Sequence, residues 1–104
     1  MFARLTFISI RSEKKEELRK IYNQEILPVV KTQRGNVGAW LLEPTNHDDD
    51  FISLTEWISE ADASAYEASG TYGMLVDKVK GLATQKTVLK NYNIAETKMI
   101  VSSL

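Results

Sequence analysis

The sequence predicts an α+β domain in which a split βαβ motif forms a four-stranded antiparallel sheet with both helices on one face. Three observations predict this class. Strand-like and helix-like segments follow one another in the order strand, helix, strand, strand, helix, strand. A short polar loop joins the second and third strands and makes them a hairpin. The 104 residues, 43% hydrophobic and 26% charged, suit a single globular domain over residues 1–104.

The first half of the chain is expected to contribute one strand and one helix. Residues 2–10 are rich in Phe, Ile, Leu and Thr, which favours a strand. Ser12 is expected to cap the helix, because glutamates follow it near the positive end of the helix dipole. Pro28 falls inside the helical pattern, so a kink or an early end is expected there. Apolar side chains recur at helical spacing at Leu18, Ile21, Tyr22, Ile26 and Val29.

The second half is expected to supply the hairpin, a second helix and a last strand. Residues 37–43 and 51–58 are strand-like and flank the polar loop 44–50. Ser59 and Asp62 form a capping box that opens an Ala-rich helix, which breaks at Ser69-Gly70. The next helical segment carries an apolar stripe, and residues 86–94 form the fourth strand, which completes a ferredoxin-like order. That stripe consists of Tyr72, Leu75, Val76, Val79 and Leu82.

Charge and composition exclude several function classes. Lys+Arg is 13 and Asp+Glu is 14, and a net charge of −1 argues against a nucleic-acid partner. The chain has no Cys, which excludes disulfides and thiolate sites. No apolar run approaches the roughly 20 residues that span a membrane, so we expect a cytoplasmic protein without a membrane partner. The loop His47-Asp48-Asp49-Asp50 has ligand-type side chains, but consecutive hairpin residues do not converge on one ion, and no metal is expected.

The strands predict a homodimer. The first strand is apolar on both sides, with Leu5 and Phe7 on one face and Phe2 and Ile8 on the other. Because the helices cover only one face, the other would remain as an apolar surface, so we expect two copies to pack sheet to sheet. A monomer with an apolar surface is the alternative. A charge at Ile8 is expected to weaken the dimer if Ile8 faces the partner.

Two further expectations concern that interface. Arg4 and Glu56 interrupt otherwise apolar strands and are expected to face the sheet-to-sheet interior and pair there. The C-terminal residues 98–104 contain Met99-Ile100-Val101 and are expected to extend an edge or lie on the other subunit, because an exposed apolar tail invites aggregation.

Residues 51–69 resemble the antibiotic biosynthesis monooxygenase domain, in which a strand ending in Trp is followed by a Ser- or Asp-rich cap and a helix. Here these features are Trp57, Ser59 and the helix after it. Ile26-Leu27-Pro28 followed by Gly35 also resembles the first helix and turn of that family. The resemblance implies a dimeric α+β barrel. It does not imply one activity, because the family is similar in fold to cofactor-free oxygenases, to haem-degrading enzymes and to members with no assigned reaction.

The haem-degrading branch can be tested on residues. That branch has an Asn on the first strand, a Trp on the second helix and a His about three turns later. In this chain residues 2–10 contain no Asn, Tyr66 stands at the Trp position, and Val76 lies near the His position. The only His is His47, in the loop. The usual iron ligand is therefore missing, and haem degradation is disfavoured.

The cofactor-free branch implies a monooxygenase that uses dioxygen and a small aromatic or quinol-like substrate, without cofactors. Such chemistry asks the protein for a dry pocket, a base or hydrogen-bond acceptor, and orientation. Trp57, Tyr66 and Tyr72 are the candidate catalytic residues, since their spacing places them between sheet and helices. Trp40 is a candidate binding residue on the second strand. Core packing is the alternative for each aromatic, and a non-catalytic ligand-binding barrel is the alternative function.

Glu25 and Arg4 complete the set of candidate binding residues. Glu25 falls in the middle of the apolar stripe of the first helix, where a buried carboxylate could act as a base near neutral pH. The alternative is that Pro28 bends the helix and lets Glu25 reach water or an Arg. No sequence feature separates the enzyme from the ligand-binding barrel.

Overall fold

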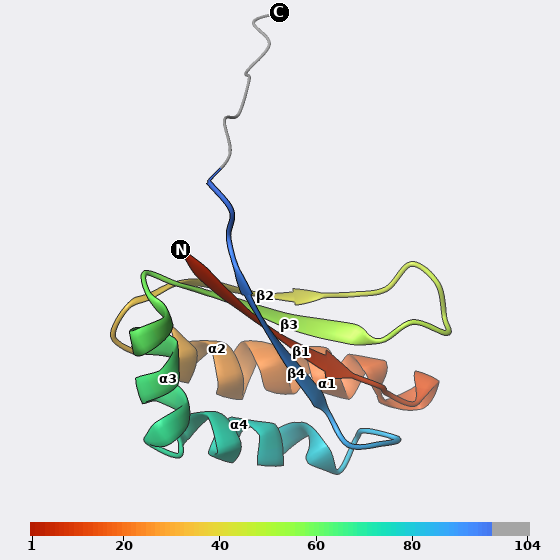
Figure 1. Cartoon of the computed structure of the whole chain (residues 1–104). Coiled ribbons are helices and arrows are strands. Elements are labelled where there is room, and N and C mark those ends of the chain that lie inside the picture. The colour runs from red at the N-terminus through yellow and green to blue at the C-terminus, as the bar shows by residue number, and fades with distance from the viewer. Residues whose placement is uncertain (97–104) are drawn as a thin grey trace, which may run out of the picture.

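A computed structural model of the chain describes residues 1–96 (Figure 1). The predicted order of strands and helices is confirmed, with each helical region divided into shorter segments. The expected contacts of residues 98–104 lie outside the described residues. None of the helices within residues 1–96 is long and apolar enough to cross a membrane. The elements are β1 (Phe2–Ile8), η1 (Ser12–Lys14), α1 (Lys15–Ile21), η2 (Tyr22–Ile26), α2 (Leu27–Val30), β2 (Asn36–Leu42), β3 (Phe51–Trp57), α3 (Glu60–Ala68), α4 (Thr71–Lys80) and β4 (Val88–Asn93).

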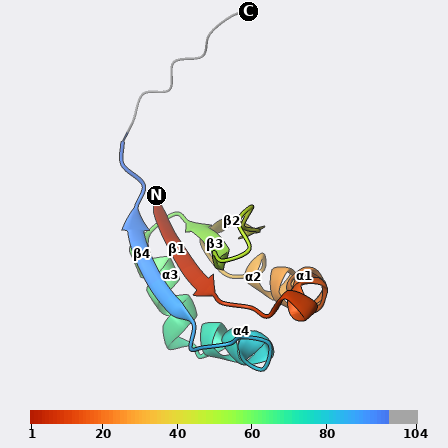
Figure 2. The ribbon, with the colours of Figure 1, turned by 90° about the vertical axis from the view of Figure 1, so that its right-hand side faces the viewer.

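The four strands form one antiparallel sheet in the order β2-β3-β1-β4, which is the predicted ferredoxin-like arrangement. Leu5 of β1 lies opposite Leu54 of β3, which in turn lies opposite Trp40 of β2. Two views show all helices in one layer on one side of this sheet (Figures 1 and 2). The predicted fold class is therefore confirmed, and the sheet is open on its other side.

Pro28 changes the hydrogen bonding of the first helical region without ending it. The region begins with the 3₁₀ turn η1 and continues through α1, the π-helical turn η2 and α2. The amide of Leu27 donates to the carbonyl of Tyr22, five residues back. Because Pro28 has no amide to donate, the added residue of a π turn accommodates it, and α2 continues to Val30. Ser12 does not cap the helix with its side chain: the 3₁₀ turn places Lys14 directly before α1.

The second helical region follows the sequence prediction closely. The Ser59 hydroxyl accepts a hydrogen bond from the Asp62 amide at 3.2 Å and donates one to the Asp62 carboxylate at 3.1 Å. This satisfies an otherwise unpaired amide at the start of α3. Gly70, with φ +85°, separates α3 from α4, because a left-handed residue cannot continue a right-handed helix. The predicted break at Ser69-Gly70 is confirmed.

The core lies between the helices and the inner face of the sheet. Side chains of Phe2, Ile8, Phe51 and Trp57 alternate along β1 and β3 toward the helices. The helices contribute the remaining buried side chains: Leu18, Tyr22, Ile26, Val30, Ala63, Tyr66, Leu75, Val79 and Leu82. Ile8 is therefore a core residue, so the condition under which a charge at Ile8 would weaken the dimer, that Ile8 faces the partner, is not met.

The outer face of the sheet is mostly apolar, as predicted, with Lys90 beside Leu5 and Glu56 beside Ala3 as its charged members. Cross-strand neighbours share a face, so the register places Trp40, Leu54 and Leu5 in one row and Leu42, Ile52, Phe7 and Val88 in the next. Arg4 lies opposite Thr55 on the inner face, whereas Glu56 lies opposite Ala3 on the outer face. The expected pair between Arg4 and Glu56 is therefore wrong, because the two side chains point to opposite sides of the sheet.

Candidate functional site

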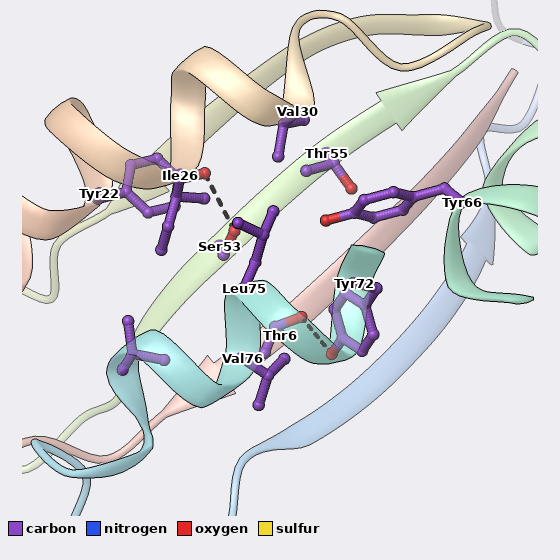
Figure 3. Close-up of a pocket in the computed structure, with 11 residues that line it drawn as sticks. Thr6, Tyr22, Ile26, Val30, Ser53, Thr55, Tyr66, Tyr72, Leu75 and Val76 are labelled. Carbon is purple, nitrogen blue, oxygen red and sulfur yellow. Dashed lines mark hydrogen bonds between the residues drawn. The ribbon is translucent and has the colours of Figure 1, made fainter. Parts of the chain in front are cut away.

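A pocket lies between the helix layer and the inner face of the sheet (Figure 3). The space that water can reach in it is about 40 Å³. Apolar side chains from η2, α2 and α4 form most of its wall, and hydroxyl groups from the strands and three tyrosines enter it. The lining residues are Thr6, Tyr22, Ile26, Val30, Ser53, Thr55, Tyr66, Tyr72, Leu75, Val76 and Val79.

Three predicted aromatic residues meet at one end of this pocket. Tyr66 of α3 stacks on Trp57 with ring centroids 4.9 Å apart. Tyr72 of α4 meets the Tyr66 ring edge-on at 5.8 Å. The break at Gly70 turns the chain between the two tyrosines, which lets both rings approach from different helices. The predicted proximity of Trp57, Tyr66 and Tyr72 is confirmed, with two of the three lining the pocket.

Trp57 supports the pocket from behind. Its side chain is fully buried, and its indole Nε1 donates a hydrogen bond of 2.9 Å to the Thr55 hydroxyl. Its ring packs on Tyr66 and does not belong to the pocket lining. Trp57 therefore positions Tyr66 and has no path to a ligand in the pocket.

The hydroxyl groups of the pocket differ in how they are used. Tyr72 shares a hydrogen bond of 2.9 Å with Thr6, and Tyr22 shares one of 3.0 Å with Ser53. The Tyr66 hydroxyl points into the pocket and has no hydrogen-bond partner among the residues that the structure describes (Figure 3). Burial raises the pKa of Tyr66 above its ordinary value, and the nearby Tyr72 adds to this. Tyr66 therefore stays protonated at neutral pH and can donate a hydrogen bond to a ligand.

Arg4 lies beside this aromatic group. Its side chain is only 3% exposed, and its guanidinium carbon lies 4.8 Å from the centre of the Tyr72 ring. Nη1 donates to the Glu67 carboxylate at 3.0 Å. Nε and Nη2 are buried and have no protein partner within residues 1–96. The structure thus places a buried cation with two unused donors directly behind Tyr72.

Two predicted binding residues lie elsewhere. The Glu25 side chain is 49% exposed and accepts a hydrogen bond of 3.2 Å from Lys78, so it does not enter the pocket. The π turn changes the helical register just there, which is why regular helical spacing misplaced Glu25 in the apolar stripe. Trp40 is 47% exposed and shares the outer face of the sheet with Leu54, so its expected place in the pocket is wrong.

Sequence reasoning missed several residues of the site. Tyr22 matched the core stripe but also lines the pocket. Thr6, Ser53 and Thr55 also line it, and their signal was present: hydroxyl residues stand at inward positions of β1 and β3 between large apolar ones. Glu67 gave no signal, because its partner Arg4 is 63 residues away along the chain.

The lining of the pocket has no ordinary general base. Across the described part of the chain, it contains hydroxyl and apolar side chains and neither a carboxylate nor an imidazole. Within the same residues, no group of three or more His, Cys, Asp or Glu side chains is placed to hold a metal ion. The pocket can therefore exclude water, stack an aromatic ring and donate hydrogen bonds. The buried charge of Arg4 lies behind Tyr72 and outside the lining.

The sequence resemblance is confirmed by comparison with known families. The profile described as "Antibiotic biosynthesis monooxygenase" matches residues 1–78, which contain every pocket-lining residue except Val79. No curated protein matches the chain.

Solved structures share the whole fold. A candidate antibiotic biosynthesis monooxygenase from Deinococcus radiodurans is 17% identical with a TM-score of 0.80, and the match covers 98% of this chain and 100% of that one. Another candidate, from Nitrosomonas europaea, is 16% identical with a TM-score of 0.75, covering 92% and 100%. The haem-degrader MhuD from Mycobacterium tuberculosis, with two haems bound in its active site, is 18% identical with a TM-score of 0.73, covering 95% and 100%. At such identities the likeness shows the fold alone.

Proposed function

The chain belongs to the antibiotic biosynthesis monooxygenase family, and we propose that it is a cofactor-independent monooxygenase that oxidises a small aromatic, quinol-like substrate with dioxygen. One observation carries this proposal: an apolar pocket into which the unpartnered hydroxyl of Tyr66 points, within residues 1–96. A mostly apolar pocket with a few convergent polar groups is the usual form of a small-molecule site.

The proposed reaction draws all its electrons from the substrate. The substrate ionises, and its anion passes an electron to dioxygen. For an anthrone-type substrate, an activated CH₂ group and O₂ give a C=O group and water. For a hydroquinone, one ring C–H bond is replaced by C–O, and the ring and O₂ give a hydroxyquinone and water. In either case the four electrons lost by the substrate reduce both oxygen atoms. The protein then has to orient the ring, exclude water and stabilise negative charge on oxygen.

The residues divide these tasks. Tyr66 donates a hydrogen bond to the substrate oxygen on which charge develops, because its raised pKa keeps it protonated. Tyr72 and the apolar side chains of α4 pack on the substrate ring. Trp57 fixes the orientation of Tyr66 through the stacked contact.

The size of the pocket requires movement on binding. A water molecule needs roughly 10–15 Å³ of such space, so about 40 Å³ holds about three waters. Typical ligand pockets are about 300–1,000 Å³, so an aromatic ring enters only if side chains move apart. Tyr72 is the best placed to move, because it stands near the start of α4 between Gly70 and Gly73.

A second function is favoured by the same lining. Because the lining within the described chain has no carboxylate or imidazole, a non-catalytic barrel that only binds a small ligand is the alternative. Both functions include a homodimer, in which the apolar outer faces of two sheets cover each other and each subunit keeps its own pocket.

Oxygen consumption tests the proposal. The purified protein is mixed with anthrone or with substituted hydroquinones, and oxygen uptake is recorded against the uncatalysed rate. We expect uptake with at least one compound and a loss in Tyr66→Phe. Saturable binding without oxygen uptake would favour the non-catalytic barrel. A parallel titration with haemin addresses the activity of MhuD: tight binding followed by reductant-dependent haem breakdown would replace the proposed substrate class.

A further inference from the structure

Arg4 is the one charged side chain that is buried within residues 1–96. Its side chain is 97% buried, yet of its three donor nitrogens only Nη1 has a protein partner within residues 1–96. That partner, Glu67, is 51% exposed, so its charge is shared with solvent. A buried guanidinium with unused donors is costly, and such groups in native proteins call for an explanation, such as a bound water or ion or a role in catalysis.

We propose that Arg4 forms an anion subsite behind Tyr72, and that the substrate carries an anionic oxygen, a carboxylate or an ionised phenol, that pairs with Nε and Nη2. The subsite adjoins the pocket of the proposed function and rests on that proposal for the aromatic part of the ligand. Arginine suits this role, because its planar fork can give two hydrogen bonds to one oxygen group.

The geometry connects Arg4 to the pocket through one side chain. Tyr72 lines the pocket and also lies against the guanidinium, 4.8 Å from ring centre to Arg4 Cζ. Thr6, two residues from Arg4 on the same face of β1, holds the Tyr72 hydroxyl. If Tyr72 turns away from Thr6, the wall between the pocket and the unused donors opens.

The backbone around Tyr72 allows this movement. Gly70, with φ +85°, precedes it by two residues, and Gly73 follows it directly. Neither glycine has another group within 4 Å of the place where a Cβ would stand. The start of α4 is therefore not held by close packing at these two positions.

The chemistry of the pocket favours an anion over a neutral ligand. The lining in the described chain carries no carboxylate that would repel one. The same lining offers no base to take a proton, so the proposed reaction depends on an ionised substrate that is stabilised where it binds. A guanidinium next to the bound oxygen provides this stabilisation, and the proton leaves to solvent.

A matched pair of small probes tests the subsite without requiring turnover. Benzoate and benzamide have the same shape and differ in charge, and both are titrated into ¹⁵N-labelled protein by NMR. We expect benzoate to bind at least tenfold more tightly than benzamide, with shifts at Thr6, Tyr66 and Tyr72. Arg4→Gln should remove this preference.

Arg4→Gln removes a buried side chain, so a loss of benzoate binding in that variant could come from a change in folding. Glu67→Gln is therefore the decisive second variant. Glu67 is half exposed, so its amide variant keeps the fold while freeing Nη1 from a competing carboxylate. We expect benzoate affinity to rise severalfold in Glu67→Gln and benzamide affinity to stay the same. A purely structural pair between Arg4 and Glu67 predicts no change for either probe.

The outcomes separate this inference from the proposed function. Equal binding of both probes, unaffected by Glu67→Gln, overturns the anion subsite and leaves the aromatic pocket standing. Benzoate binding with shifts confined to residues outside the pocket overturns the subsite as well. If neither probe binds, the anion subsite is overturned, and oxygen uptake with anthrone or hydroquinones then decides whether the proposed function stands without it.

Discussion

Tyr66 and Tyr72 line the same pocket but are expected to act differently, and their Phe variants should show this: one lowers turnover and the other lowers stability. Tyr66→Phe removes a hydroxyl that has no partner in the described chain, so we expect turnover to fall at least tenfold, about 1.4 kcal/mol in activation free energy, with stability unchanged. Tyr72→Phe breaks the hydrogen bond to Thr6 and should lower the free energy of unfolding by about 1 kcal/mol. Steady-state oxygen uptake and urea denaturation measure the two effects. Equal turnover in both variants and wild type would remove the tyrosines from the mechanism.

Three glycines give a graded test of backbone strain. Gly35 has φ +81°, and an added Cβ would collide with the Asp62 side chain. Gly35→Ala should therefore lower the free energy of unfolding by more than the roughly 1–2 kcal/mol that a left-handed residue costs. Gly70 is also left-handed, but an added Cβ there meets no other group, so Gly70→Ala should lower the free energy of unfolding by less than Gly35→Ala does. Gly73 lies inside α4 with open space around it, so Gly73→Ala should raise the free energy of unfolding by up to about 1 kcal/mol. Urea denaturation should show Gly73→Ala as the most stable variant and Gly35→Ala as the least stable. A different order would contradict the local geometry.

Residues of the site could be predicted from sequence only where a local sequence pattern, such as helical spacing, determines where the side chain lies. Tyr66 and Tyr72 were found because helical spacing and the Ser69-Gly70 break are local features of the sequence. Arg4 stands out in sequence as a charge within an apolar strand, but its contacts depend on Glu67 and Tyr72, more than 60 positions along the chain. No periodicity encodes such a pair, so its neighbours could not be named from sequence.

At the scale of elements, the π turn before Pro28 decides the environment of Glu25. It moves this carboxylate to the surface, where Lys78 pairs with it. We expect Glu25→Gln to change the free energy of unfolding by less than about 1 kcal/mol, since partly exposed ion pairs contribute little. Oxygen uptake by this variant should equal that of wild type across pH 6–9. A large loss of activity would show that Glu25 reaches the substrate after all.

The sequence predicts where the strands and helices lie, but it predicts only in part which side of each one faces the core. Hydrophobic runs, the capping box and the break at Gly70 located every strand and helix within a few residues. The strand β2 is apolar on both sides, so its sequence could not decide which side faces the helices; pairing with β3 places Trp40 on the outer face. The π turn was also hidden, because a proline within a helix has several structural solutions.

At the scale of the whole molecule, the outer face of the sheet predicts association. Leu54 stands at its centre, between Leu5 and Trp40. Trp40, Leu42, Val88 and Tyr92 are exposed large apolar or aromatic side chains on this one face. Exposed apolar side chains gathered on one face are typical of an interaction surface, and packing against a second copy would bury them. We therefore expect sedimentation to give twice the 11.8 kDa of one chain.

Leu54→Lys tests this interface directly. A lysine at the centre of two packed sheets would be buried without a partner, at a cost of about 3–5 kcal/mol, so we expect the variant to sediment as a folded monomer. The lysine is tolerated in that monomer because the outer face is then open to water. Met74→Lys is the matched control: it adds the same charge at an exposed position of α4, on the helix side of the molecule, and should leave the dimer intact. A wild-type protein that sediments at 11.8 kDa at micromolar concentration would reject the dimer, and the apolar rows would then have to be a surface for a different partner.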